Sequence, residues 1–418
     1  FFILIFSPKI SSALDFEEIG VLSGRFSASH PSIAVNPLNG EVCVAYQDRG
    51  SGVYKDIRVK CLRDGIWQDL GSPIRYGVYG DLQIDETGYY LAVWDYITWW
   101  RGAIRVFKFG GNDWVQIGHL SRFRDDEHHP SRFSLTIHNG NPVVAFWGVK
   151  VPHINIYVYM YEDGGWNELR AEEVTTSKYS LPPYWWRSPS SIGVVSDSGN
   201  IYLMWDMLVD GNGDALYVER FDGFKWEVLE GKFWAGRIGR DYPFVRNASI
   251  SMNKDGFPAI LYVEDVYWPY RVYMDIWDGN HWVEVDGLVS DENIFSVEVP
   301  SHTKAVVFTP EGELFAGFLQ VYASSNSHTK TVLKRYDPSN RIWVKEYESS
   351  PYVHFRVSSP SLAYHGGYIY IAEGGAKPGY PLPPSLIYIK RAVLPLGRAQ
   401  FEKCFSRVVS SKDAIEEL

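Results

Sequence analysis

Residues 31–48 read PSIAVNPLNGEVCVAYQD, and residues 55–71 read KDIRVKCLRDGIWQDLG. The first stretch predicts an apolar strand, a Gly-containing turn and a second apolar strand. The second stretch predicts a third strand, a tight Asp-Gly turn and a Trp at the start of a fourth strand. Asp-Gly between two alternating strands indicates a β-hairpin, because both central residues of that turn need positive φ. Together the two stretches predict one unit of four antiparallel strands.

The turn before the Trp recurs along the chain. Its copies end at Trp67, Trp114, Trp166, Trp226, Trp282 and Trp343. A Trp at one place in every unit is better explained as a packing plug between neighbouring sheets than as six ligand sites. The first strands of the units are expected to begin near Pro31, Asp81, Pro130, Pro189, Asn247, Lys304 and Pro360. Spacings of about 50–60 residues are those of a four-stranded propeller blade.

We therefore predict an all-β fold, a single β-propeller of four-stranded antiparallel blades. The prediction is seven blades, with six or eight as alternatives. The seventh unit lacks the Asp-Gly-Trp turn, and either residues 16–20 (FEEIG) or residues 400–404 could supply its outer strand. We favour FEEIG, which resembles WQDLG and WVQIG in other units. A strand from the N-terminal end would close the ring and remove exposed edges.

The two ends of the chain differ from the repeats. Residues 1–13 (FFILIFSPKISSA) are typical of the back half of a secretory signal peptide cleaved after Ala13. A first β-strand is the alternative. We assign residues 14–405 to the propeller domain and residues 406–418 to a tail or short helix. The expected location is therefore secreted or on the cell surface, and no segment approaches transmembrane length.

Composition restricts the classes of partner. The chain has 418 residues and a formal net charge of −10, which argues against nucleic-acid binding. We expect a monomer. The three cysteines, Cys43, Cys61 and Cys404, make neither a disulfide framework nor a metal-binding spacing. Cys43 and Cys61 fall on neighbouring predicted strands, so they either pair in an oxidising compartment or remain two reduced, buried thiols.

The loops of a propeller blade alternate between two faces. The turns between first and second strands, and between third and fourth strands, are short and share one face. The opposite face is expected to carry long aromatic segments, namely residues 95–102, 147–153, 181–189, 236–246 and 264–271. Long loops on a rigid scaffold are where binding usually occurs, so this face is the predicted site.

Basic residues precede several of the predicted innermost strands. They are His30, His128, His129, Arg187 and Arg246. Such a cluster in an acidic protein indicates an anionic ligand, because Arg binds carboxylate or sulfate with paired donors. The alternative is that these side chains only satisfy backbone carbonyls and nearby carboxylates. A metal at residues 125–129 (DDEHH) is the weaker interpretation, because the spacing fits neither zinc nor calcium sites; we expect no metal and no cofactor.

The sequence resembles two groups of propellers. PSIAV, AYQDRG and DIRVKCLRDGIW are similar to the repeats of the sialidase-like propeller superfamily, of whose Asp-box only Asp-Gly and Trp are kept here. Residues 125–148, 184–206 and 253–295 resemble propeller polysaccharide lyases and their uncharacterised relatives. A sialidase-type glycoside hydrolase is the less favoured implication, because residues 29–31 read Ser-His-Pro where sialidases place Arg-Ile-Pro.

The lyase resemblance implies β-elimination on a uronic acid. Arg187 or Arg246 would neutralise the substrate carboxylate, His128 or His129 would remove the α-proton, and Tyr242 or Tyr184 would protonate the leaving oxygen. Trp185, Trp186 and Trp268 would stack on sugar rings, with His30 and Arg240 also binding substrate. The predicted partner is an anionic polysaccharide or glycan. Whether the protein is an enzyme stays open, and the alternative is a non-catalytic cell-surface or adhesion module that binds glycan or protein.

Overall fold

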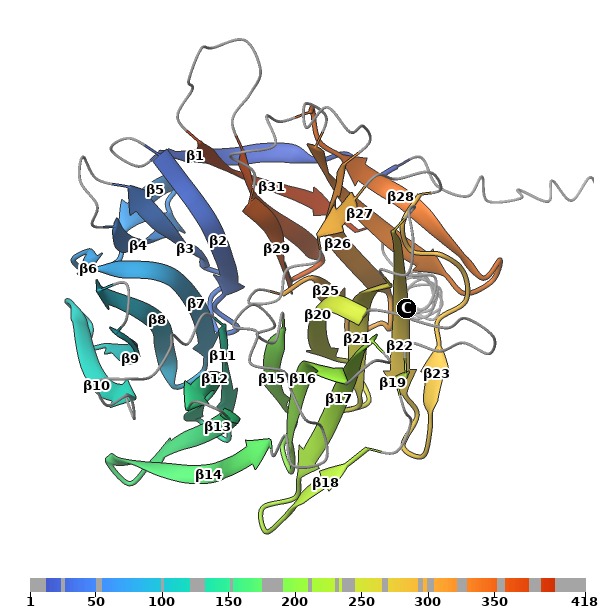
Figure 1. The fold of residues 1–418 in the computed structure, drawn as a ribbon. Helices are drawn as coiled ribbons and strands as arrows, with labels where there is room; N and C mark the ends of the chain where they lie inside the picture. The colour runs from blue at the N-terminus through green and yellow to red at the C-terminus, as the bar shows by residue number, and fades with distance from the viewer. Residues whose placement is uncertain are drawn as a thin grey trace, which may run out of the picture.

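The computed structural model describes residues 13–23, 27–49, 55–98, 101–120, 132–150, 153–174, 191–209, 213–229, 233–234, 245–264, 270–291, 296–298, 304–321, 329–351, 358–375 and 385–394. These residues form seven antiparallel sheets arranged in a ring (Figure 1). The predicted seven-bladed propeller is confirmed. Within the described residues, no helix is long and apolar enough to cross a membrane.

The first three blades follow the predicted order of strands from the ring centre outward. Blade 1 contains β2 (Ser27–Val35), β3 (Val42–Arg49), β4 (Lys55–Arg63) and β5 (Ile66–Asp69), and β6 (Ile74–Arg75) also pairs with β4. Blade 2 contains β7 (Gly77–Asp85), β8 (Gly88–Thr98), β9 (Arg101–Phe109) and β10 (Trp114–Leu120). Blade 3 contains β11 (Phe133–His138), β12 (Asn141–Lys150), β13 (His153–Glu162) and β14 (Gly165–Val174).

The next three blades repeat this plan with small additions. Blade 4 contains β15 (Ile192–Ser196), β16 (Ile201–Val209), β17 (Gly213–Phe221) and β18 (Trp226–Val228), with β19 (Phe233–Trp234) also on β17. Blade 5 contains β20 (Val245–Met252), β21 (Pro258–Glu264), β22 (Arg271–Trp277) and β23 (Trp282–Glu284). In blade 6, β24 (Ser296–Glu298) and β25 (Val306–Phe308) share the inner edge of β26 (Leu314–Val321), followed by β27 (Thr329–Asp337) and β28 (Ile342–Glu348).

Blade 7 is built from both ends of the described chain. It contains β29 (Ser358–His365), β30 (Tyr368–Gly375), β31 (Leu386–Val393) and β1 (Glu17–Ser23). β1 pairs antiparallel with β31, so the predicted closure by the N-terminal strand is confirmed. Phe16 takes the place of the missing Trp and packs on Tyr347 of blade 6, with ring centroids 5.0 Å apart. The alternative strand, residues 400–404, lies outside the described residues, as do residues 1–12 and 406–418.

The apolar core lies between blades. Seven clusters of buried side chains each join two neighbouring sheets. A propeller strand is buried on both faces, which explains why runs such as VCVAY and LFAGF are apolar without alternation. The energy of folding is therefore spread around the whole ring.

The repeated Trp side chains join each blade to the one before it. The indole N–H of Trp67 donates to the carbonyl of Ile19 at 3.0 Å, and those of Trp114, Trp166 and Trp226 reach Leu70, Ile117 and Leu169 in the same way. A Gly follows the accepting residue in three of these contacts. A Cβ at Gly20 or Gly118 would overlap the indole ring. The Trp is thus a packing plug, as predicted.

The Asp-Gly turns follow the sequence prediction only in part. Asp64 and Gly65, and again Asp163 and Gly164, have the predicted pair of positive φ angles. In blades 4 and 5 the Asp side chain instead accepts hydrogen bonds from backbone N–H groups two and three residues later. These longer loops are stabilised by the carboxylate, so positive φ at Asp is not needed there.

Candidate functional site

Several predicted site residues lie outside the described residues. They are His128, His129, Tyr184, Trp185, Trp186, Arg187, Arg240, Tyr242 and Trp268. Arg246 is described through its backbone only, within β20. Of the predicted set, His30 has a described side chain.

The prediction of a long loop is wrong for two segments. Residues 95–102 and 147–153 belong mostly to strands, because β8 runs to Thr98 before β9 starts at Arg101, and β12 runs to Lys150 before β13 starts at His153. Trp147 is buried at 3% exposure within blade 3 and is not a surface aromatic. Aromatic residues in a strand and in a loop look alike in sequence, since aromatics favour strands.

His30 occupies a bulge in the innermost strand of blade 1. Its φ is 54°, and the pairing of β2 with β3 shifts between Ser29 and Ser32. β20 has the same shift between Arg246 and Ser249, with Asn247 at φ 49°. Asn247, rather than the predicted Arg246, therefore occupies the position equivalent to His30. A bulge changes the alternation of side chains by one residue, which sequence alignment of the repeats did not reveal.

The His30 ring is held by polar and aromatic contacts. Its Nδ1 lies 3.0 Å from the hydroxyl of Ser29, which donates in turn to Gln47. Tyr79 of blade 2 meets the ring edge-on at 4.6 Å and stacks on Trp94. The ring is thus fixed at the junction of blades 1 and 2, with part of its surface accessible to solvent.

Positive charges converge on this ring. The pKa of His30 is lowered to about 3, chiefly by burial and in addition by the charges of Lys55, Arg49 and Arg132. Arg49 and Lys55 lie directly opposite each other on β3 and β4. Like charges at opposed strand positions repel, and the pKa of Lys55 is lowered by burial and by the charge of Arg49. Neither cation forms an ion pair with any of the described carboxylates. We call His30, Tyr79, Trp94, Arg49, Lys55 and Arg132 the His30 cluster.

The low pKa of His30 makes stability fall in acid. The unfolded chain takes up a proton below about pH 6.5, whereas folded His30 stays neutral down to about pH 3. Relative to His30→Asn, the wild-type protein should lose up to about 1.4 kcal/mol of unfolding free energy per pH unit between those values. Urea unfolding at a series of pH values measures this. Asn suits the positive φ, since Asn247 has it in blade 5.

The comparison with His30→Asn is necessary because Asp81 opposes the loss of unfolding free energy that His30 causes in acid. Burial raises the pKa of Asp81 to about 6, so its protonation stabilises the folded protein as the pH falls from about 6 to 3.8. Both proteins carry Asp81, so this contribution cancels in the difference. If the unfolding free energies of the two proteins change with pH in parallel, His30 is not held neutral in the folded protein.

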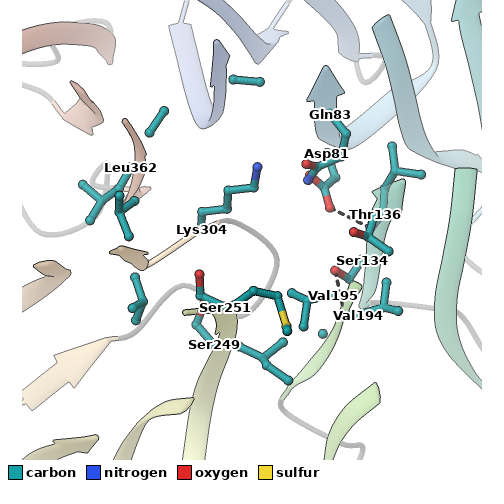
Figure 2. A pocket seen from close by; sticks show the side chains of 18 of the residues that line it. Asp81, Gln83, Ser134, Thr136, Val194, Val195, Ser249, Ser251, Lys304 and Leu362 are labelled. Carbon is teal, nitrogen blue, oxygen red and sulfur yellow. Dashed lines mark hydrogen bonds between the residues drawn. The ribbon is translucent and has the colours of Figure 1, made fainter. Parts of the chain in front are cut away.

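A cavity of about 330 Å³ occupies the centre of the ring. It is lined by the innermost strands of all seven blades (Figure 2). In each blade, one backbone N–H group beside the cavity donates a hydrogen bond to an acceptor in the blade before it. We call these seven acceptors the belt. The acceptors are the side chains of Ser32, Asp81, Ser134, Ser191, Ser249 and Ser361 and the backbone carbonyl of Lys304.

Two charges in this belt were missed by the sequence analysis. Asp81 and Lys304 stand where other repeats have Ser32, Ser134, Ser249 or Ser361, and they face each other across the cavity (Figure 2). An alignment of the seven repeats at this Ser position would have revealed both charged residues. We call Asp81, Lys304 and the cavity between them the channel site.

Cys43 and Cys61 form a disulfide between β3 and β4, with Cα atoms 4.0 Å apart. Of the two alternatives from the sequence, the structure has the paired one. Glu41 lies close to both sulfurs, the one such group of potential metal ligands among the described residues. Sulfurs joined in a disulfide offer no thiolate, so this group does not indicate a metal site. Residues 125–129 lie outside the described residues.

Comparison with known proteins supports the fold. No family model and no curated protein matches the sequence. A protein of unknown function from Dyadobacter fermentans DSM 18053 has a TM-score of 0.52 and 11% identity, and the match covers 91% of this chain and 99% of that one. The polysaccharide lyase Uly1 has a TM-score of 0.55 and 9% identity, with coverage of 88% and 90%. These similarities show the fold alone.

Proposed function

We propose that the protein binds an anionic, uronate-containing glycan at the His30 cluster. The observation that carries the proposal is the opposed pair of Arg49 and Lys55, which lacks a described carboxylate partner beside a neutral His30. A bound carboxylate would relieve the repulsion between the two cations. Tyr79, which is half-buried beside the His30 ring, adds aromatic surface of the kind that packs on apolar sugar faces.

Cleavage by β-elimination is the finer part of the proposal. A base with a pKa of about 3 accepts protons poorly at neutral pH, so His30 is suited to binding rather than to proton removal. The base would then be His128 or His129, with Arg187 or Arg246 neutralising the substrate carboxylate and Tyr242 protonating the leaving oxygen. The similarity of fold to a polysaccharide lyase is compatible with this chemistry. Without cleavage, the same surface makes the protein a glycan-binding module.

Secretion is proposed on two grounds. Residues 1–13 have the pattern of a signal peptide, and the Cys43–Cys61 disulfide persists in an oxidising compartment. The sialidase-like assignment rests on the repeat pattern, and glycoside hydrolysis is the less favoured chemistry.

The binding proposal is tested with an array of acidic and neutral polysaccharides. We expect the wild-type protein to bind polyuronates, and Arg49→Met/Lys55→Met to weaken that binding at least about 10-fold, because charge-assisted hydrogen bonds to a carboxylate are lost. Lys254→Met is the matched control, since Lys254 lies on a short blade 5 turn and pairs with Asp255. Equal binding by the double variant and the control would refute the site.

Cleavage is measured on every polysaccharide that binds, from the ultraviolet absorbance of unsaturated uronate ends. If a polyuronate is cleaved, His129→Ala and Arg246→Ala should abolish the activity while binding persists. If a polysaccharide binds without producing new absorbance, the result supports a glycan-binding module and refutes the lyase.

A further inference from the structure

The link between blades 6 and 7 does not use the side chain of Lys304. Its backbone carbonyl accepts the N–H of Leu362 at 2.8 Å, so the backbone alone supplies the link to blade 7. The ammonium group makes no hydrogen bond or ion pair within the described residues, although it points into the cavity toward Asp81 (Figure 2). A Ser, the commonest residue at this position of the repeat, would leave the link unchanged.

Lys304 lies on the wall of an open cavity, and its side chain is accessible to solvent there. The surrounding protein lowers the pKa of Lys304 by partial loss of hydration, while the charge of Asp81 raises it. The two charges influence each other without being within ion-pair distance. A cation that loses part of its hydration and has no ion-pair partner among the described residues is costly, and an anion placed beside it would offset that cost.

The rest of the cavity wall offers hydrogen bonds to hydroxyl groups. Asp81 lines the cavity and accepts from the backbone N–H of Leu135 at 2.8 Å and from Gln83 at 3.0 Å, and each oxygen of a carboxylate can accept a further hydrogen bond. The hydroxyls of Thr136 and Ser251 also line the space (Figure 2). At about 330 Å³ the cavity is at the small end of ligand pockets, which typically span about 300–1,000 Å³.

We propose that the channel site binds a small hydroxycarboxylate, with the carboxylate on Lys304 and a hydroxyl on Asp81. This site is separate from the His30 cluster, and the inference does not depend on the proposed function. A single uronic acid belongs to the ligand class, whereas a neutral sugar lacks the anion that Lys304 requires.

The test uses D-glucuronate as the probe and D-glucose as the neutral comparator, with binding to the full chain measured by calorimetry. We expect glucuronate to bind and glucose not to bind. Lys304→Met should weaken glucuronate binding at least about 10-fold, because a charge-assisted hydrogen bond is lost. Lys254→Met is the matched control and should leave it unchanged. The Arg49→Met/Lys55→Met variant removes the cations of the His30 cluster, so the glucuronate binding that it retains belongs to the channel site.

A second measurement covers the case in which Lys304→Met does not fold. The wild-type protein is acylated at its lysines with and without glucuronate, and the modified sites are read by mass spectrometry. Protection of Lys304, with Lys254 unprotected, supports the channel site. The absence of glucuronate binding, undiminished binding by Lys304→Met, or equal acylation of Lys304 with and without the probe overturns it. Loss of binding confined to Arg49→Met/Lys55→Met also overturns it and favours the His30 cluster.

Discussion

Replacing Arg170 by methionine should lower the free energy of unfolding by about 3–5 kcal/mol. Arg170 follows Leu169 in β14, at the position where Gly20, Gly71 and Gly118 stand in other blades. It forms an ion pair with Glu219 of β17 in blade 4, and both residues are at most 8% exposed. Removal of the guanidinium would leave the Glu219 carboxylate buried without its cation, which costs far more than the pair contributes.

Urea unfolding of two further variants isolates that cause. Arg170→Met/Glu219→Leu should recover most of the loss, because no charge is then buried. Arg220→Met is the matched control, since the adjacent Arg220 pairs at 2.8 Å with Glu227 and both side chains are 36% exposed. An exposed pair of this kind contributes at most about 1 kcal/mol. If Arg170→Met and Arg220→Met cost the same, the buried pair does not hold blades 3 and 4 together.

Arg170 also shows which parts of the fold the sequence could predict. The spacing of the repeats and the recurring Trp predicted seven blades, because similar side chains must fill the interface between each pair of neighbouring blades. Arg170 breaks the Gly pattern, and its guanidinium instead lies 5.7 Å from the Trp226 ring. The sequence pattern does not reveal that a long side chain can replace Gly by stacking on the indole, since the contact depends on the position of blade 4.

The candidate sites were harder to predict for a related reason. Arg49 and Lys55 become a pair only once the register of β3 and β4 is known, and that register is not visible in either strand alone. His30 was found because it directly precedes a predicted innermost strand, but the bulge that positions it was not. Asp81 and Lys304 were each assigned to the start of a strand, although both lie on the cavity wall.

Replacing Gly20 by alanine should lower the free energy of unfolding by about 3 kcal/mol, more than its single methyl group implies. A Cβ at this position would overlap the Trp67 indole, and the ring would have to move away from the carbonyl of Ile19. The cost combines overpacking of a filled interface with loss of the indole hydrogen bond. Gly165→Ala is the matched control, because its Cβ would reach no closer than 4.0 Å to the carbonyl of Glu162.

The strands that lose protection first show whether Gly20→Ala weakens the closure of the ring or destabilises the whole propeller. β1 pairs with β31 on one side, and the interface filled by Trp67 joins blade 7 to blade 1. Amide hydrogen exchange should therefore speed up first in β1 and β31, before the remaining blades respond. β2 begins at Ser27, shortly after β1 ends, and carries His30. A weakened closure should consequently loosen the His30 cluster and reduce glycan binding, whereas uniform exchange around the ring would show that closure by β1 is not the weak point.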